Sequence, residues 1–204
     1  MSELAPVIGV IIAGGLSTRL GGRFKGNVRI GEFTLLERVV DRFRSQVDRV
    51  LLNLNEPADL RIDLTVVPDS VKGRPGPLAG LTAAFEYLEA NKVAYGAVAA
   101  VPCDGPYLPE QLVNELAAAM LRESADVATV QYRGELQPTF SLWRRSAGPV
   151  VTAHLREKGD GGFRNLLRDL NAAIVEWPVS SLDPFFNINT PQDVAQARAL
   201  AQEL

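Results

Sequence analysis

The sequence predicts an α/β domain built on a mostly parallel, doubly wound sheet with helices on both faces. Short apolar runs rich in Val and Ile alternate along the chain with longer segments whose apolar residues recur at helical spacing. The chain has 204 residues, the size of one ordinary domain, and it contains no repeat, low-complexity tract or linker that would divide it. We therefore expect residues 1–204 to form a single domain.

The first half of the chain carries the clearest strand and helix patterns. Val7–Ile12 is a nearly continuous apolar run, typical of a strand that is buried on both faces. Residues 35–47 place apolar side chains on one helix face with charged residues between them, which predicts an amphipathic helix. We expect a second helix over 77–91, which begins with Pro, and further strands over 50–54, 64–67 and 95–101.

The second half continues this alternation. Helices are expected over 109–123, 147–157 and 163–170, and strands over 127–130, 138–143 and 173–177. In the segment that follows, Thr190 can cap a helix, Pro191 can occupy its first turn and Asp193 can reach back to the cap. This pattern predicts a last helix that runs to Glu203.

Unusual residues follow three of the expected strands. Glycines at 14–15 follow the first strand, Asn53 lies in the second, and Pro102-Cys103-Asp104 follows the strand at 95–101. In a doubly wound sheet, ligands bind beyond the carboxyl ends of the strands. We therefore expect the functional site at this edge of the sheet.

Residues 13–25 join the first strand to later structure with four glycines, two arginines and a lysine. Glycines let backbone N–H groups approach a phosphate closely, and basic side chains neutralise its charge. The segment is neither a P-loop, because it lacks Gly-Lys-Ser/Thr, nor the Gly-x-Gly-x-x-Gly of dinucleotide binders. Basic residues exceed acidic ones by four between Arg19 and Arg49, although the whole chain has a net charge of −3. We expect a small-anion site here, with a flexible loop of solvated charges as the alternative.

Several motifs, taken in order, resemble one known family. They are Ile12-Ala13-Gly14-Gly15, Arg19-Leu20-Gly21-Gly22, Lys25-Gly26, Asn53, Pro68-Asp69-Ser70, Gly76-Pro77-Leu78-Ala79-Gly80-Leu81, Pro102-Cys103-Asp104-Gly105-Pro106, Pro138-Thr139-Phe140 and Asn187-Ile188-Asn189-Thr190-Pro191. The combination is similar to that of the molybdenum cofactor guanylyltransferases, the MobA-like branch of the nucleotidyltransferases with a Rossmann-like fold. The resemblance spans nearly the whole chain.

The resemblance implies a nucleotide-binding N-terminal half and an acceptor-binding C-terminal half. Asp104 would hold Mg²⁺, Lys25 would meet phosphate, and these two residues would carry catalysis. The residues implied to contact GTP are Ile12, Ala13, Gly14, Gly15, Arg19, Lys25, Asn53, Asp69 and Asp104. Asn187 and Asn189 are the candidates for the acceptor.

The acidic and amide candidates also have ordinary structural explanations. Asp104, at the end of a buried strand, is a hard oxygen ligand suited to Mg²⁺, but Asp is also favoured in turns. Asp69 can likewise be a simple turn residue. Asn187 and Asn189, two apart in an extended segment, would point the same way toward a metal-bound phosphate or a second substrate. Alternatively, Asn189 belongs only to the start of a helix.

The sequence departs from the family pattern in three motifs. Phe24 stands where members commonly have Asp before the lysine, and Gln137 stands where His often precedes the Pro-Thr-Phe segment. Gly161 and Gly162 occupy positions where members tend to carry paired arginines. The last two departures lie in the half expected to hold the acceptor.

The composition excludes several classes of protein. The single Cys103 and the single His154 cannot form an intramolecular disulfide or a Cys/His zinc site, so a metal here is expected to be a hard ion with oxygen ligands. We expect Cys103 to be a buried packing group and His154 to be exposed on a helix.

No run approaches the ~20 apolar residues of a membrane span. Residues 1–6 lack a basic start, and the chain is mildly acidic. We expect a cytoplasmic protein without membrane or nucleic-acid partners.

The resemblance implies transfer of GMP from GTP to the terminal phosphate of a molybdenum-bearing molybdopterin, with Mg²⁺ as cofactor and release of pyrophosphate. Transient contact with cofactor insertion proteins or apo-molybdoenzymes would follow. Cytidylyl transfer to the same pterin and guanylyl transfer to another phosphorylated small molecule stay open, although Ala13-Gly14-Gly15 favours guanine within the resemblance. A non-catalytic nucleotide-binding module, suggested by Phe24 and the missing arginine pair, is the alternative from a different class.

Overall fold

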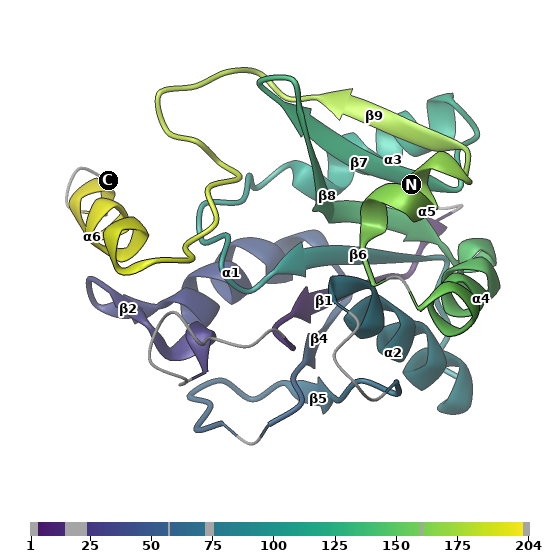
Figure 1. Cartoon of the computed structure of the whole chain (residues 1–204), viewed down its shortest axis with the longest axis horizontal. Coiled ribbons are helices and arrows are strands. Elements are labelled where there is room, and N and C mark those ends of the chain that lie inside the picture. Colours follow the sequence, from purple (N-terminus) through teal and green to yellow (C-terminus); the bar gives the residue numbers. More distant parts are fainter. Residues whose placement is uncertain (1–3, 15–23, 57, 72–75, 160, 202–204) are drawn as a thin grey trace.

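The computed structural model describes residues 4–14, 24–56, 58–71, 76–159 and 161–201. Within these residues the chain forms a seven-stranded sheet in the order β5-β4-β1-β6-β8-β7-β9 (Figure 1). In chain order the strands are β1 (Val7–Ile12), β4 (Arg49–Asn53), β5 (Thr65–Val67), β6 (Ala97–Pro102), β7 (Val127–Tyr132), β8 (Glu135–Arg144) and β9 (Ala172–Glu176).

One strand of this sheet is reversed. β1 pairs in parallel with β4 and β6, β4 pairs in parallel with β5, and β7 pairs in parallel with β9. β8 is antiparallel to both β6 and β7. The predicted mostly parallel sheet is therefore confirmed. Because β8 is reversed, its amino-terminal half lies at the edge where the other strands have their carboxyl ends.

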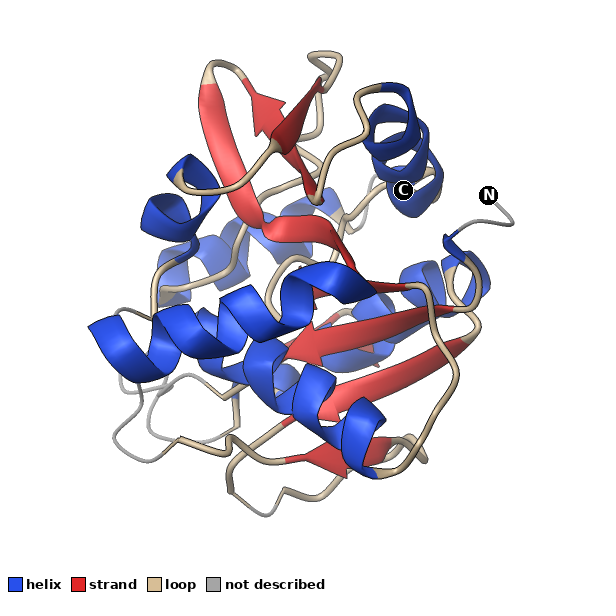
Figure 2. Cartoon of the chain, turned by 90° about the vertical axis from the view of Figure 1, so that its right-hand side faces the viewer, coloured by secondary structure: helices blue, strands red, loops and turns tan. Residues whose placement is uncertain are grey.

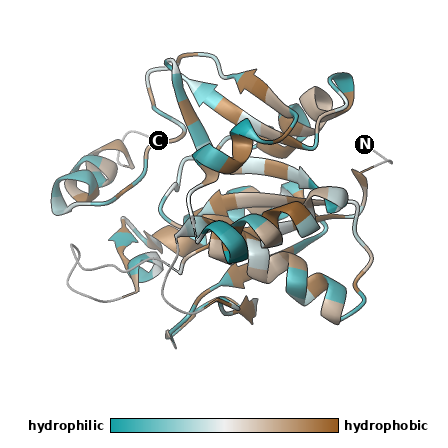
Figure 3. Ribbon diagram, turned by 45° about the vertical axis from the view of Figure 1, so that its right-hand side comes forward, coloured by the Kyte–Doolittle hydropathy of each residue, from teal (hydrophilic) through white to brown (hydrophobic). Residues whose placement is uncertain are grey.

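Helices cover both faces of the sheet (Figure 2). Val7 and Ile11 of β1 pack in one core cluster with α1 (Leu35–Phe43) and α3 (Leu112–Arg122). The intervening apolar residues of β1 pack in a second cluster with α2 (Pro77–Ala90), α4 (Gly148–Lys158) and α5 (Phe163–Arg168). Figure 3 shows apolar residues along the central strands and the helices packed on them. This alternation buries β1 on both faces and confirms the doubly wound arrangement.

Most elements lie within a few residues of their predicted bounds, with two exceptions. The helix expected over 35–47 ends at Phe43 and continues as a short 3₁₀ helix, η4 (Arg44–Gln46). A small hairpin of β2 (Arg29–Ile30) and β3 (Phe33–Thr34) was not predicted, because two-residue strands carry too little periodicity. Gly31 turns this hairpin with a φ of +65°.

The expected exposure of His154 is wrong. It is buried, because it lies three residues after the core residue Val151 and next to Leu155, on the side of α4 that faces the core. The expected burial of Cys103 is confirmed. Among the helices that the structure describes, none combines the length and the apolar composition needed to cross a bilayer.

The last helix that the structure describes is α6 (Pro191–Leu200), which stands apart from the sheet in Figure 1. The predicted helix end at Glu203 lies outside the described residues. Thr190 caps α6 and forms the predicted capping box with Asp193. A third apolar cluster joins α6 to the hairpin and to the loop after β6, and its members include Ile30, Tyr107 and Ile188. This cluster fixes the segment that carries Asn187 and Asn189.

Candidate active site

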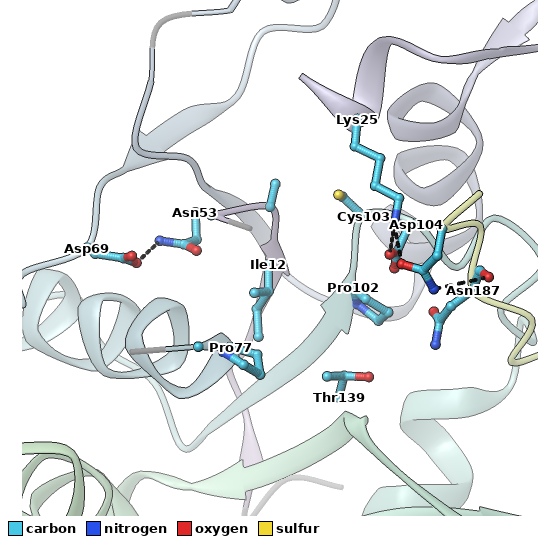
Figure 4. Close-up of a pocket in the computed structure, with 14 residues that line it drawn as sticks. Ile12, Lys25, Asn53, Asp69, Pro77, Pro102, Cys103, Asp104, Thr139 and Asn187 are labelled. Carbon is cyan, nitrogen blue, oxygen red and sulfur yellow. Dashed lines mark hydrogen bonds and ion pairs between the residues drawn. The ribbon is translucent and has the colours of Figure 1, made fainter. Parts of the chain in front are cut away.

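A pocket of about 480 Å³ opens at the carboxyl ends of β1, β4, β5 and β6, where the sequence predicts the functional site (Figure 4). The reversed strand β8 and the segment before α6 complete its wall. The lining residues are Ile12, Ala13, Gly14, Lys25, Asn53, Asp69, Gly76, Pro77, Pro102, Cys103, Asp104, Thr139, Asn187 and Asn189. Most of the predicted site residues are thus brought to one cavity.

One side of the pocket holds a lysine between two oxygen acceptors. Lys25 Nζ donates to Oδ2 of Asp104 and, at 2.7 Å, to Oδ1 of Asn189. The side chains of Lys25 and Asp104 are only 14% and 18% exposed, so water screens this pair incompletely. Three segments that are distant in sequence therefore meet around one positive charge.

Backbone hydrogen bonds hold these residues in place. Lys25 begins a 3₁₀ helix, η3 (Lys25–Asn27), and Asp104 lies two residues after the end of β6. The Ile188 N–H donates to the Asp104 carbonyl at 3.0 Å, which ties the Asn187–Asn189 segment to the end of β6. The Asn189 N–H donates to the Asp193 carboxylate at 2.8 Å.

Asp193 is an ionised anchor for this segment. Burial opposes its charge, but hydrogen bonds from the backbone N–H groups of Asn189 and Thr190 outweigh that effect and lower the pKa of the Asp193 carboxyl. The carboxylate also stands at the amino-terminal end of α6, where the helix dipole favours negative charge.

The other side of the pocket is a network of amides around a carboxylate. Asn53 Nδ2 donates to Oδ1 of Asp69 at 2.8 Å and to the Val67 carbonyl at 3.1 Å. Figure 4 shows this pair on the opposite side of Ile12 from Lys25 and Asp104. Asn55, which the sequence analysis did not single out, donates from Nδ2 to Oδ2 of Asp69 at 2.7 Å.

Two glycines bring backbone close to this network. A Cβ on Gly14 would lie 3.0 Å from both Asn53 Oδ1 and Asn55 Nδ2, and a Cβ on Gly80 of α2 would lie 2.7 Å from Asn53 Cγ. The Ala13 N–H donates to the Asn53 carbonyl at 3.0 Å. The start of the glycine-rich segment is therefore packed directly on the Asn53 side chain.

The oxygen donors beside Lys25 fit a hard divalent cation. Within the described residues, no three His, Cys, Asp or Glu side chains form a metal cluster. Asp104 and Asn189 instead offer one carboxylate and one amide oxygen, and both already face a positive charge. Mg²⁺ commonly takes one or two carboxylates and completes its shell with substrate phosphates and water. This donor set suits such an ion.

Cys103 lines the pocket without reactive character. The thiol is buried, and burial raises its pKa well above the usual range. A thiol that stays protonated is a packing group rather than a nucleophile, as the sequence analysis expects.

Two departures from the family pattern have local structural roles. The ring of Phe24 covers Gly26, where an added Cβ would collide with it. The Gly161 carbonyl accepts the Leu78 N–H at 3.0 Å and so satisfies a free donor in the first turn of α2. Gln137 lies on β8 beside the register shift between β8 and β7.

Two predicted residues, Gly15 and Arg19, lie outside the described residues. Sequence reasoning gave no site role to Thr139, which lines the pocket because β8 is reversed. It also missed Asn55, although the spacing of Asn53 and Asn55 at a strand end is the kind of signal that singled out Asn187 and Asn189.

Comparison with known proteins decides the family. Residues 9–174 match the MobA-like NTP transferase domain. A molybdenum cofactor guanylyltransferase of Rhodopseudomonas palustris strain BisB5 is 38% identical over 94% of this chain and 92% of its own length. The chain belongs to the molybdenum cofactor guanylyltransferase family. As a member of this family it is a nucleotidyltransferase.

Solved structures confirm the fold at lower identity. The molybdopterin-guanine dinucleotide biosynthesis protein A of Archaeoglobus fulgidus is 21% identical, covers 97% of this chain and 100% of its own, and superposes with a TM-score of 0.75. A Mycobacterium tuberculosis protein crystallised as a complex with manganese is 15% identical, covers 96% of this chain and 99% of its own, and gives a TM-score of 0.68. Both share the doubly wound architecture of this guanylyltransferase family member.

Proposed function

We propose that this protein transfers GMP from GTP to the terminal phosphate of molybdenum-bearing molybdopterin. An oxygen of the acceptor phosphate attacks the α-phosphorus of GTP, a new P–O–P bond forms, and the bond to the β-phosphate breaks. The products are a guanine dinucleotide cofactor and pyrophosphate. The acceptor phosphate is already an anionic nucleophile, so the protein mainly positions the reactants and neutralises charge.

The N-terminal half is the proposed nucleotide site. The nucleotide binds to the backbone of Ile12, Ala13 and Gly14, and also to Gly15 and Arg19. Asn53 and Asp69 contact the nucleotide from the opposite side of the pocket. Lys25 stabilises the negative charge that develops on the departing pyrophosphate. The support for this division is that Lys25 and Asp69 stand on opposite sides of one cavity of about 480 Å³.

Mg²⁺ is the proposed cofactor, held by Asp104. Bound there, it would neutralise the phosphates and act as a Lewis acid at the α-phosphate. Asn189 supplies a second oxygen beside the same site, and Lys25 would turn from these oxygens toward the triphosphate when the metal binds.

The C-terminal half is the proposed acceptor site. Asn187 and Asn189 line the pocket from the segment before α6, and Thr139 lines it from β8. Figure 4 labels Asn187 and Thr139. The product would pass on by transient contact with cofactor insertion proteins or apo-molybdoenzymes.

The observation that carries this proposal is the meeting of Lys25, Asp104 and Asn189 around one positive charge, across the cavity from the Asn53–Asp69 pair. This places a cationic group and hard oxygen donors together at the carboxyl edge of the sheet, where a nucleoside triphosphate and its metal require them.

The test combines binding with turnover. Calorimetry should show that GTP binds more tightly than CTP or ATP, and that Mg²⁺ strengthens GTP binding. Addition of molybdopterin should then release one pyrophosphate per guanine dinucleotide formed. Tighter binding of CTP, with cytosine in the product, would contradict the guanylyl assignment. Binding of GTP without pyrophosphate release would indicate a non-catalytic module.

A further inference from the structure

Asn55 is tied to Asp69 by two hydrogen bonds that form a closed ring. The Asn55 amide donates from Nδ2 to Oδ2 of Asp69 at 2.7 Å, and its Oδ1 accepts the Asp69 backbone N–H at 2.8 Å. Both ends of one side-chain amide are therefore engaged by a single residue. Nothing in the proposed function gives Asn55 a role.

With Asn53, this ring fixes the plane of the Asp69 carboxylate. Asn53 donates to Oδ1 and Asn55 donates to Oδ2, so each carboxylate oxygen receives one amide N–H. A carboxylate without such partners rotates broadly about its last torsion. Each oxygen can accept a further hydrogen bond, and Asp69 lines the pocket, so an oriented pair of acceptors remains for a bound ligand.

The ring also lies against the glycine-rich segment. A Cβ on Gly14 would lie 3.0 Å from Asn55 Nδ2 and 3.4 Å from Asp69 Oδ2. The position of Asn55 thus sets the distance between the carboxylate and the backbone that begins the glycine-rich segment.

The surroundings of Asn55 argue against a role in folding stability. Asn55 is exposed, and Asp69 is only half-buried. Exposed hydrogen bonds compete with water and contribute little to the free energy of unfolding. The buried Asn53 and its bond to the Val67 carbonyl already hold β4 and β5 together at this end. The two hydrogen bonds between Asn55 and Asp69 therefore constrain the orientation of the Asp69 carboxylate more than they stabilise the fold.

We propose that Asn55 is a positioning residue of the nucleotide site, which orients the Asp69 carboxylate toward N–H or O–H groups of the bound nucleotide. This inference rests on the proposed function, because it assumes that Asp69 contacts the nucleotide. It adds a residue that acts through Asp69 and does not itself touch the substrate.

The test is Asn55→Asp, which keeps the shape and the Oδ1 acceptor but replaces the donor to Asp69 with a carboxylate. The expected loss is that of one well-oriented hydrogen bond to the nucleotide, so KM and Kd for GTP should rise about 3- to 10-fold. Turnover at saturating GTP should change by less than about threefold, because the substitution leaves Lys25, Asp104 and Asn189 unchanged. Thermal unfolding should show a midpoint close to that of the wild type.

An exchange variant separates positioning from local structure. Asn55→Asp with Asp69→Asn restores a donor opposite an acceptor but moves the carboxylate to position 55. GTP affinity should stay low if Asn55 serves to orient a carboxylate at position 69. Recovery of GTP affinity in the exchange variant would overturn the inference. It would show that a hydrogen bond between positions 55 and 69 is enough for GTP binding, whichever position carries the carboxylate.

Asn55→Ala removes the same donor without placing a second carboxylate against Asp69, and it should raise the Kd for GTP by a similar factor. A further control adds a carboxylate at an exposed asparagine elsewhere. Asn171 is also exposed and donates to a carbonyl, that of Ser124 at 3.2 Å, outside the pocket. Asn171→Asp should leave the Kd for GTP unchanged. If Asp69→Asn weakens GTP binding while Asn55→Asp does not, the inference fails and the proposed function stands. If the wild-type chain binds no GTP, the proposed function fails, and the inference falls with it.

Discussion

The two sides of the pocket are organised in opposite ways. On the network side, formed by Asn53, Asn55 and Asp69, neutral amide groups donate to both oxygens of one carboxylate. On the side that we propose for the metal, called the metal side, the ammonium group of Lys25 donates to one oxygen each of Asp104 and Asn189. The first arrangement leaves one buried acceptor, Asn53 Oδ1, without a hydrogen-bond partner among the described residues. The second arrangement holds a cationic side chain at the oxygens that we propose for Mg²⁺.

This difference indicates which side can change when substrate binds. The network side is pre-organised, so a nucleotide bound as proposed would meet acceptors already in position and would lose little free energy in ordering them. The metal side carries a long, flexible lysine, whose donors turn readily from carboxylate to phosphate. Variants on the network side should therefore change affinity, and variants on the metal side should change turnover.

The largest effect is expected from Asp104→Asn, which removes the charge on the metal side and keeps the shape. Turnover should fall by on the order of 10²–10³-fold, because a preorganised charge at the reacting phosphate is lost. Pyrophosphate release measured across a Mg²⁺ titration, with circular dichroism to confirm the fold, checks this. The surface pair of Lys158 and Asp169, at 2.8 Å, offers the matched control, and Asp169→Asn should leave turnover unchanged. Retained Mg²⁺-dependent turnover in Asp104→Asn would reject the metal assignment.

A smaller effect is expected from Gly80→Ala, in which a new Cβ on α2 would press against the Asn53 side chain of the network side. The new Cβ would lie 2.7 Å from Asn53 Cγ, and Asn53 cannot yield without losing its bonds to Val67 and Asp69. Overpacking of this kind costs about 1–3 kcal/mol, and the Kd for GTP should rise. Urea unfolding and calorimetry measure the two effects.

The double variant Gly80→Ala with Asn53→Ala tests the cause of that effect. Without the Asn53 amide, the new Cβ faces the Cβ of residue 53 at 3.3 Å. Ala is also the better helix former by about 1 kcal/mol. Adding Gly80→Ala to Asn53→Ala should therefore not destabilise the protein further. If Gly80→Ala destabilises the Asn53→Ala protein as much as it destabilises the wild type, the close contact with the Asn53 amide is not the cause of the destabilisation.

The smallest effect is expected from Asp193→Ala, which loosens the anchor of Asn189. Removing this helix-capping carboxylate should cost about 0.5–1 kcal/mol at pH 7 and weaken Mg²⁺ dependence only slightly. The pKa of Asp193 is lowered by folding, so its stabilisation is complete above the ordinary value of 3.8 and is lost as pH falls through the lowered value. The difference from the wild type should therefore shrink at about pH 3 in urea unfolding.

Glu37 provides the matched control for that prediction. It occupies the same position in the capping box of α1, where a hydrogen bond from the Thr34 backbone N–H lowers the pKa of its carboxyl. Glu37→Ala should cost a similar free energy with the same pH dependence, and it should leave Mg²⁺ dependence unchanged. An equal change in Mg²⁺ dependence in both variants would show that the Asp193 effect is not transmitted through Asn189.

Most of the fold was predictable because the strands and helices carry strong local patterns. Val7–Ile12 is apolar at every position, since both of its faces are covered. The capping box of Thr190 and Asp193 is predicted by the four residues from Thr190 to Asp193 alone. The β2–β3 hairpin and the burial of His154 were not predictable, because one depends on two-residue strands and the other on what packs against α4. The reversal of β8 likewise depends on pairing with β6 and β7.

Local sequence decides which chemical groups this protein has and which strand ends carry them. Gly14, Asn53, Asp69 and Asp104 all follow or end strands, and parallel strands must bring those ends to one edge. Only tertiary packing decides how the groups pair. Lys25 meets residues 79 and 164 positions away, and Asn55 closes its ring on Asp69, because these contacts depend on distances between segments that the chain between them does not specify.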